Sequence, residues 1–347
     1  MAGNMKKILF SISFVCLFVF ADPVFAQTGI APKHPNDPIV FVPGLAASYN
    51  RRVLFKDKTA GGWNFIPFGN VYKGLISRLE DVDYAYGDDF FIAFYDWRHS
   101  NEQSASEYLA PVIAQAKEHS ASGKVDIVAH SMGGLLVQEY IKSDAYTEGE
   151  IDQFIMLGTP NAGASNAYLP WEGGVLPPSW GKVTTWYINS IEDSLKSVKK
   201  LTFDAPKSFR HFFPSLKELL PTGDFITKNS ETVPRGDLTE QNPFLEALGN
   251  FRDTLIHETG IFVTTIAGTD EATLDTIAVN NSRTDEDISL ERWRDGHPIA
   301  EVPAPNTTAG DQTVLASSAL FEEEGNVHIY SLPGVSHTAL PEEAQDE

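Results

Sequence analysis

Residues 125–142 read VDIVAHSMGGLLVQEYIK and form the most informative stretch of the chain. The apolar run 125–128 predicts a buried strand, and 135–142 predicts an amphipathic helix. The turn between them, Ala129-His130-Ser131-Met132-Gly133-Gly134, has small residues two positions before and two positions after the serine. A strained strand-to-helix turn needs them because it packs closely on its neighbours, although glycine is commoner where Ala129 stands. The pattern predicts a nucleophile elbow in which Ser131 lies at the start of a helix, whose dipole favours developing negative charge.

Short apolar runs alternate with helical patterns along the first half of the chain. Strands are expected at 38–42, 90–95, 125–129 and 154–157, and helices at 71–82, 106–119 and 135–142. This rhythm predicts a mostly parallel sheet with helices on both faces, an α/β fold. Two later strand patterns, at 261–267 and 327–332, extend the same sheet.

The rhythm is interrupted between residue 161 and about residue 258. The segment is rich in Trp, Phe, Pro and Ser and shows no clear strand pattern. Loops longer than about 15 residues are usually functional or disordered, so this one predicts a cap or lid inserted into a single domain, 27–347. Its aromatic residues favour an ordered cap: Trp171, Trp180, Trp186, Tyr187, Phe209, Phe212 and Phe213.

The first 26 residues have the pattern of a cleavable signal peptide. Lys6 and Lys7 precede an apolar run at 8–21, and Val24-Phe25-Ala26 offers a cleavage site. The run is shorter than the roughly 20 residues of a membrane span. We therefore expect a secreted or periplasmic protein. The single cysteine, Cys16, lies in this segment, so the mature chain would fold without disulfides.

The composition excludes some classes of partner. A formal net charge of −21 argues against binding to nucleic acid, and also against strong electrostatic binding to anionic membranes. The acidic run Asp285-Glu286-Asp287 lacks the alternating ligands of a calcium loop, so 284–291 is expected to be a solvated loop. We expect neither a metal nor an organic cofactor.

A nucleophilic serine needs a histidine and a carboxylate, which follow it in the chain order Ser, acid, His. His337 comes shortly after the strand 327–332 and is the expected base. His328 lies inside that strand, and His297 precedes a proline in a polar loop. Two carboxylates fit the acid. Asp311 lies 26 residues before His337 but would also cap the helical stretch 314–320, whereas Asp270 directly follows the strand 261–267. Spacing leaves these two open.

An oxyanion hole uses two backbone N–H groups. One is expected from Met132, the residue after the nucleophile. The other is expected from Leu45, because the turn Val42-Pro43-Gly44-Leu45 follows the first strand and Gly44 lets it bend. A simple Pro-Gly turn is the alternative interpretation.

The motifs together resemble those of the lecithin:cholesterol acyltransferase-like lipases of the α/β-hydrolase superfamily. The matching pieces are Pro38-Ile39-Val40-Phe41-Val42-Pro43-Gly44-Leu45, Tyr95-Asp96-Trp97-Arg98, Ala129-His130-Ser131-Met132-Gly133-Gly134, Leu157-Gly158-Thr159-Pro160 and Gly310-Asp311-Gln312-Thr313-Val314. The resemblance implies Asp311 as the acid, a mobile lid within 161–258, and phospholipid or neutral lipid substrates. It leaves Asp96, Trp97 and Arg98 either as pocket residues or as a structural group. The mature chain lacks the lid disulfide of animal members.

We therefore expect a serine hydrolase with Ser131, Asp311 and His337 as the triad and Leu45 and Met132 as the oxyanion hole. Its partner would be a lipid or ester substrate, with transient contact to a lipid interface. The alternatives are a short-chain carboxylesterase and a non-catalytic binding protein of the same fold. The sequence does not indicate an oligomeric state.

Overall fold

The computed structural model describes residues 36–347 apart from 60, 68–69, 301–302 and 345–347. The expected signal peptide, residues 1–26, lies outside the described residues. Within the described part of the chain, every helix is too short or too polar to cross a membrane.

The helices and strands have the following bounds. The strands are β1 Ile39–Val42, β2 Ser48–Tyr49, β3 Asn64–Phe65, β4 Phe90–Ile92, β5 Val125–His130, β6 Ile151–Leu157, β7 Ile226–Lys228, β8 Glu231–Val233, β9 Phe262–Thr269, β10 Glu271–Thr273, β11 Ile277–Asn280, β12 His297–Pro298, β13 Thr307–Gly310 and β14 Val327–Pro333. The α-helices are α1 Arg51–Lys56, α2 Lys73–Asp81, α3 Asn101–Ser104, α4 Ala110–Glu118, α5 Met132–Lys142, α6 Gly181–Lys199, α7 Lys207–Phe212, α8 Pro243–His257, α9 Asp285–Ser289, α10 Ala316–Ala319 and α11 Leu340–Glu343.

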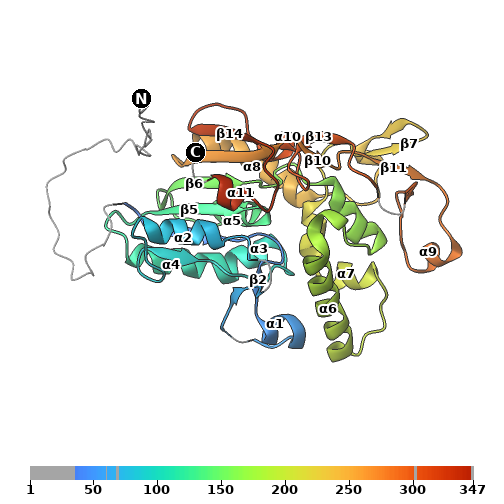
Figure 1. The fold of residues 1–347 in the computed structure, drawn as a ribbon, viewed down its shortest axis with the longest axis horizontal. Helices are drawn as coiled ribbons and strands as arrows, with labels where there is room; N and C mark the ends of the chain where they lie inside the picture. The colour runs from blue at the N-terminus through green and yellow to red at the C-terminus, as the bar shows by residue number, and fades with distance from the viewer. Residues whose placement is uncertain (1–35, 60, 68–69, 301–302, 345–347) are drawn as a thin grey trace, which may run out of the picture. The chain divides into compact units, whose positions relative to one another are not determined.

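The central sheet has six strands in the order β14-β9-β6-β5-β1-β4. Every neighbouring pair is parallel, which confirms the predicted parallel α/β architecture. Because all strands run in one direction, their carboxyl ends meet at one edge of the sheet. Figure 1 shows β5, β6 and β14 of this sheet. Ser131 follows β5 at that edge, and His337 follows β14.

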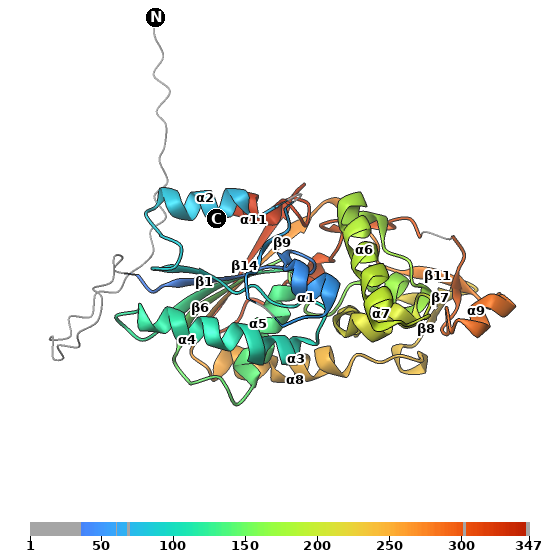
Figure 2. The ribbon, with the colours of Figure 1, turned by 90° about the horizontal axis from the view of Figure 1, so that it is seen from below.

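Alternating side chains of β1 explain why helices cover both faces. Val40 and Val42 belong to the core cluster that includes residues of α4 and α5, whereas Phe41 packs with Tyr72 and Leu75 on the side of α2. Figure 2 shows α2 and α11 above the sheet, and α4 and α8 below it. The long core helix α5 is buried along almost its whole length, between the sheet and α8.

The segment 161–258 contains α6, α7, α8 and two short strands, so the expectation of no strands there is wrong. β7 and β8 form a hairpin whose two turn residues, Asn229 and Ser230, have φ of 52° and 66°. Such positive φ values match the twist of a tight hairpin. β7 also pairs with β11, which follows β9, in a four-stranded sheet of order β12-β11-β7-β8. This sheet therefore joins strands from inside and outside the segment 161–258.

A buried glutamate, Glu172, connects α7, which lies inside the segment 161–258, with the chain before β12, which lies outside it. Glu172, 1% exposed, pairs with Arg210 of α7 and with Arg294 before β12. It also accepts a hydrogen bond from the Arg294 backbone N–H at 2.9 Å. The carboxylate thus holds together chain segments that lie far apart in the sequence.

The expected solvated loop at 284–291 is also wrong, because residues 285–289 form α9. Thr284 and Asp287 make a capping box: the Thr284 Oγ1 accepts from the Asp287 N–H at 3.0 Å, and Asp287 Oδ2 accepts from the Thr284 N–H at 2.9 Å. The capping box T-x-x-D at this point stabilises the first turn.

Candidate active site

Ser131 occupies a strained turn between β5 and α5. Its φ of 55° and ψ of −130° are unusual for a residue with a side chain, and its N–H donates to the Leu157 carbonyl oxygen at 2.8 Å. The two glycines that follow let α5 start close to neighbouring backbone. A Cβ on Gly133 would lie 2.5 Å from the Val42 carbonyl oxygen, and one on Gly134 would overlap the Thr159 side chain. The glycines therefore permit the tight turn that exposes the serine hydroxyl.

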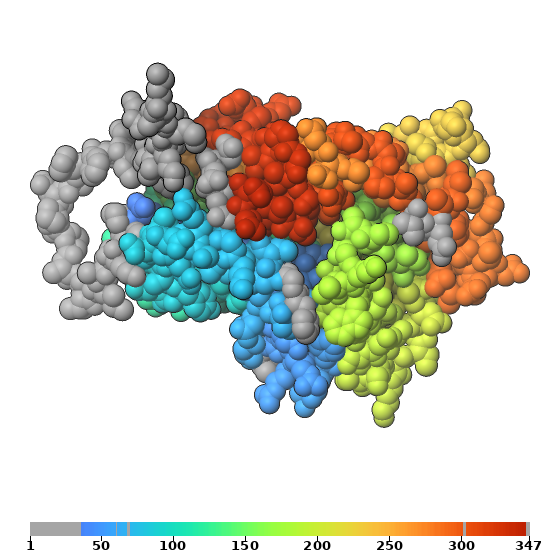
Figure 3. Space-filling view, viewed as in Figure 1, coloured from blue at the N-terminus to red at the C-terminus, as the bar shows by residue number. Residues whose placement is uncertain are grey.

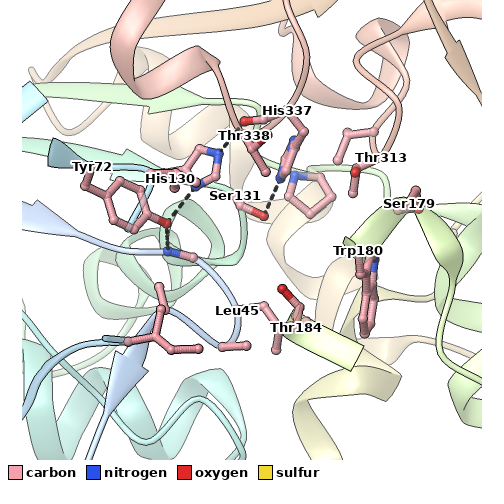
Figure 4. Close-up of a pocket in the computed structure, with 18 of the residues that line it drawn as sticks. Leu45, Tyr72, His130, Ser131, Ser179, Trp180, Thr184, Thr313, His337 and Thr338 are labelled. Atoms are coloured by element: carbon pink, nitrogen blue, oxygen red, sulfur yellow. Dashed lines mark hydrogen bonds between the residues drawn. The ribbon is translucent and has the colours of Figure 1, made fainter. Parts of the chain in front are cut away.

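The structure brings Ser131, His337 and Asp311 into one hydrogen-bonded chain, and Figure 4 shows its Ser131–His337 part. His337 Nε2 lies 2.9 Å from Ser131 Oγ, and His337 Nδ1 lies 2.7 Å from Asp311 Oδ2. Asp311 is 1% exposed and His337 is 8% exposed. In this geometry the serine hydroxyl donates to Nε2 while Nδ1–H donates to the carboxylate.

The other carboxylate oxygen of Asp311 is held by its own loop. Oδ1 accepts from the N–H groups of Val314 at 2.7 Å and Thr313 at 3.0 Å. Gly158 has φ 58° and leaves room for the pair, because a Cβ there would lie 3.0 Å from His337 Nδ1 and 3.1 Å from Asp311 Oδ2. Both carboxylate oxygens of Asp311 therefore accept hydrogen bonds, which fixes the orientation of the side chain.

The other candidates from the sequence do not reach this chain. Asp270 is exposed, with φ 63°, at the end of β9. His328 is exposed on β14, and His297 lies in β12 with its Nδ1 2.8 Å from the Pro298 carbonyl oxygen. Neither histidine lines the cleft that contains Ser131.

The two N–H groups expected to form the oxyanion hole belong to Leu45 and Met132. Leu45 follows the turn after β1, and Met132 is the first residue of α5. Neither N–H donates to any residue that the structure describes. The Pro43–Gly44 peptide bond, one peptide before the Leu45 N–H, is hydrogen-bonded on both sides. Its Pro43 carbonyl oxygen accepts from Tyr95 Oη at 2.9 Å, and its Gly44 N–H donates to Tyr72 Oη at 2.9 Å.

His130, next to the serine, is a buried site residue that the sequence pattern did not single out. Its Nδ1 lies 2.9 Å from Tyr72 Oη, and its Nε2 lies 2.9 Å from the His337 carbonyl oxygen. Burial, and then the neighbouring His337, lower the pKa of His130 well below its ordinary value, so the ring is neutral. Burial raises the pKa of Tyr72, so its hydroxyl keeps its proton. The partners of these residues are remote in sequence, and no local pattern signals them.

Ser131 opens into a cleft of about 230 Å³. One wall comes from Trp180, which precedes α6, and from Thr184 in its first turn (Figure 4). In Figure 3, α6 lies beside segments from the first hundred residues, below the C-terminal segments. Among the described lining residues none is Lys, Arg, Asp or Glu. Most are apolar: Leu45, Ala46, Ala47, Phe65, Ile66, Val71, Pro160, Ala164, Trp180, Val183, Leu219 and Val314.

The Tyr95-Asp96-Trp97-Arg98 motif is structural rather than part of the cleft. Asp96 and Arg98 are buried and make a two-pronged ion pair, with contacts of 2.6 Å and 2.8 Å. Trp97 is fully buried and stacks on Phe213 at 5.5 Å between ring centroids. Tyr95, the first residue of the motif, contacts the turn after β1 through its hydrogen bond to the Pro43 carbonyl oxygen.

One cluster among the described residues has carboxylates close enough to hold a metal ion: Asp37, Asp126 and Asp152. Asp126 and Asp152 lie near the amino ends of β5 and β6. Ser131 follows the carboxyl end of β5, so this cluster belongs to the opposite edge of the sheet.

Comparison with known proteins identifies the family of the chain. The family model of lecithin:cholesterol acyltransferase matches residues 64–337. Lysosomal phospholipase A and acyltransferase of Canis lupus familiaris and that of Homo sapiens are each 26% identical over 145 residues, which cover 41% of this chain and 34% of theirs. The match thus spans about a third of the length of these relatives.

Solved structures of lipases and esterases are also similar. The mature lipase BlEst2 of Bacillus licheniformis is 15% identical, with 91% of this chain and 92% of that chain covered and a TM-score of 0.42. A metagenomic carboxyl esterase is 13% identical, with 91% and 69% covered and a TM-score of 0.38. The family model matches most of the chain, and the parallel sheet carries a serine turn after β5. The chain has the α/β-hydrolase fold and belongs to the lecithin:cholesterol acyltransferase family.

Proposed function

We propose that the chain is a serine hydrolase that cleaves lipid carboxylic esters through an acyl-enzyme. The observation that carries the proposal is the continuous hydrogen-bonded chain Ser131–His337–Asp311, whose serine and histidine line an apolar cleft. A serine hydroxyl becomes a useful nucleophile only when a base takes its proton and a third group orients that base. All three groups are present in that order.

In the proposed first step, Ser131 Oγ attacks the ester carbonyl carbon while His337 Nε2 takes the hydroxyl proton. The carbonyl oxygen becomes an anion and accepts the N–H groups of Leu45 and Met132. The tetrahedral intermediate collapses, the C–O bond to the alcohol breaks, and Nε2 returns the proton to the leaving oxygen. Water repeats the sequence in reverse and frees the acid; a lipid alcohol in its place would give acyl transfer.

The lining of the cleft favours the binding of an uncharged, apolar acyl group. Its described lining residues are mostly apolar, and none of them carries a permanent charge. Burial of each methylene of an acyl chain in such a cleft contributes about 0.8 kcal/mol. The relatives named as phospholipase A and acyltransferase act on lipids, which is consistent with the same substrate class here.

The test is hydrolysis of p-nitrophenyl esters with acyl chains from two to sixteen carbons, by the wild type and by Ser131→Ala. Activity that favours long chains and is lost in the variant supports the lipid esterase. Activity that falls steadily beyond four carbons points instead to a short-chain carboxylesterase. An inert wild type that a serine-reactive phosphonate does not label contradicts the catalytic proposal and favours a binding protein.

We also propose export of the chain, on the basis of the sequence pattern at 1–26 alone. Cleavage after Ala26 would leave Gln27 as the first residue of the mature protein. The intact mass of the protein recovered outside the cytoplasm tests this directly. An N-terminus that still contains Lys6 and Lys7 would contradict it.

A further inference from the structure

Two buried side chains connect the turn before Leu45 with the loop that carries His337. Tyr72 Oη accepts from the Gly44 N–H at 2.9 Å and lies 2.9 Å from His130 Nδ1. His130 Nε2 lies 2.9 Å from the backbone carbonyl oxygen of His337 (Figure 4). Tyr72 is 3% exposed and His130 is 4% exposed. The connection spans both sides of Ser131 without including the serine itself.

The acceptors fix where the protons lie. A carbonyl oxygen only accepts, so His130 Nε2 carries the hydrogen that it donates to His337. His130 is neutral, so its Nδ1 carries no hydrogen and accepts a hydrogen bond from the Tyr72 hydroxyl. The Tyr72 oxygen then has a lone pair for the Gly44 N–H. The three hydrogen bonds therefore all donate in the same direction, from Gly44 through Tyr72 and His130 to the His337 carbonyl oxygen.

Each end holds a backbone group whose position matters for the proposed chemistry. The Pro43–Gly44 peptide is held by Tyr72 at its N–H and by Tyr95 at its carbonyl oxygen, which fixes its plane just before Leu45. The His337 carbonyl oxygen is held by His130, and the His337 N–H donates to the Asp311 carbonyl oxygen at 2.7 Å. The His337 backbone is thus held on both sides, and the imidazole remains available to Ser131.

We propose that Tyr72 and His130 are positioning residues that set the separation between the Leu45 amide and the His337 imidazole. The proposal rests on the proposed esterase function. A misplacement of about 1 Å at a reacting centre costs on the order of 100-fold in rate, so such a connection has a direct kinetic effect. The ring of His130 also lies 4.7 Å from that of His337. Because His130 is neutral, no second positive charge faces His337 when it takes the serine proton.

The test compares Tyr72→Phe, His130→Gln and His130→Phe with two controls at exposed positions, Tyr86→Phe and His328→Gln. Rates on p-nitrophenyl esters are expressed per site titrated with a phosphonate, which removes any effect of unfolded protein. We expect Tyr72→Phe to lower kcat about 10- to 100-fold, since it leaves two buried polar groups unpaired. KM should change less than about threefold, since the cleft keeps its shape. The controls should match the wild type.

The two His130 variants separate hydrogen bonding from packing. Glutamine offers one donor and one acceptor, so it should retain more kcat than phenylalanine, which offers a ring alone. Equal losses in the two, or a Tyr72→Phe protein with kcat per titrated site within about twofold of the wild type, would overturn the proposal. Should His130→Phe fail to fold, Tyr72→Phe decides, since it loses only one oxygen. A wild type that neither hydrolyses esters nor reacts with the phosphonate contradicts the esterase proposal itself.

Discussion

Asp311→Asn is the sharpest test of the proposed acid, because the structure dictates which way the new amide must point. Asp311 Oδ1 accepts two backbone N–H groups, at 2.7 Å and 3.0 Å, and Oδ2 faces His337 Nδ1 at 2.7 Å. The carbonyl oxygen of an asparagine must take the Oδ1 place, since an NH₂ group there would face two donors. Its NH₂ group then faces Nδ1, which must accept, so the imidazole carries its hydrogen on Nε2 and cannot take the serine proton.

The expected loss is about 10³- to 10⁴-fold in kcat, which corresponds to roughly 4–5.5 kcal/mol in the activation free energy. The free energy of unfolding should change by less than about 1 kcal/mol, because both loop hydrogen bonds remain. The measurements are ester hydrolysis and urea denaturation of the same preparations.

Asp270→Asn is the matched control. Its side chain is exposed and its φ of 63° suits asparagine, so activity and stability should equal those of the wild type. An Asp311→Asn enzyme that retains more than about a tenth of the wild-type kcat, or a loss in Asp270→Asn as deep as in Ser131→Ala, would show the assignment to be wrong.

Three further changes test other parts of the fold. Gly134→Ala places a Cβ against the Thr159 side chain, 2.7 Å from its Cγ2, and should lower the free energy of unfolding by about 2–3 kcal/mol in urea; adding Thr159→Ala should recover part of the loss. Burial, together with two neighbouring aspartates, raises the pKa of Asp126 to about 7, so the folded chain binds a proton that the unfolded chain releases between about pH 4 and pH 7. The free energy of unfolding therefore falls as the pH rises through that window. Asp126→Asn should be more stable than the wild type at pH 8, by at most about 3–4 kcal/mol, and equal to it near pH 4. Equal stability of the two proteins at both pH values would contradict the raised pKa. Glu172→Ala removes the buried carboxylate that Arg210 and Arg294 share, while Arg294 keeps its ion pair with Glu240 and Arg210 its longer one with Glu291. The free energy of unfolding in urea should fall by at most about 3–5 kcal/mol, and an unchanged denaturation midpoint would show that Glu172 contributes little.

The parts of the molecule that the sequence predicted are those with a local pattern. The strands of the central sheet are buried apolar runs, and the turn at Ser131 has its small residues at fixed spacing, so both follow from short stretches. The hairpin of β7 and β8 escaped notice because each strand has three residues, too few to show alternation. In α9 the acidic composition concealed a capping box.

Contacts between remote residues have no such pattern. Tyr72 meets Gly44 across 28 positions, and His130 meets His337 across 207. Their hydrogen bonds depend on how β1, β5 and β14 are ordered in the sheet, which no single stretch specifies. His130 was visible only as the neighbour of Ser131.

The geometry at the end of β9 shows why only one of the two candidate acids reaches His337. Asp270 follows β9 directly, but its side chain is exposed. The chain then leaves in β10 and returns in β13, which pairs antiparallel with β10 and brings Asp311 back over Gly268. A Cβ on Gly268 would lie 2.9 Å from that of Asp311, so the carboxylate of Asp311 occupies the space beyond the strand end. The two candidate acids therefore lie near the same strand end, although they are far apart in the sequence, and the carboxylate of Asp311 is the one that contacts His337.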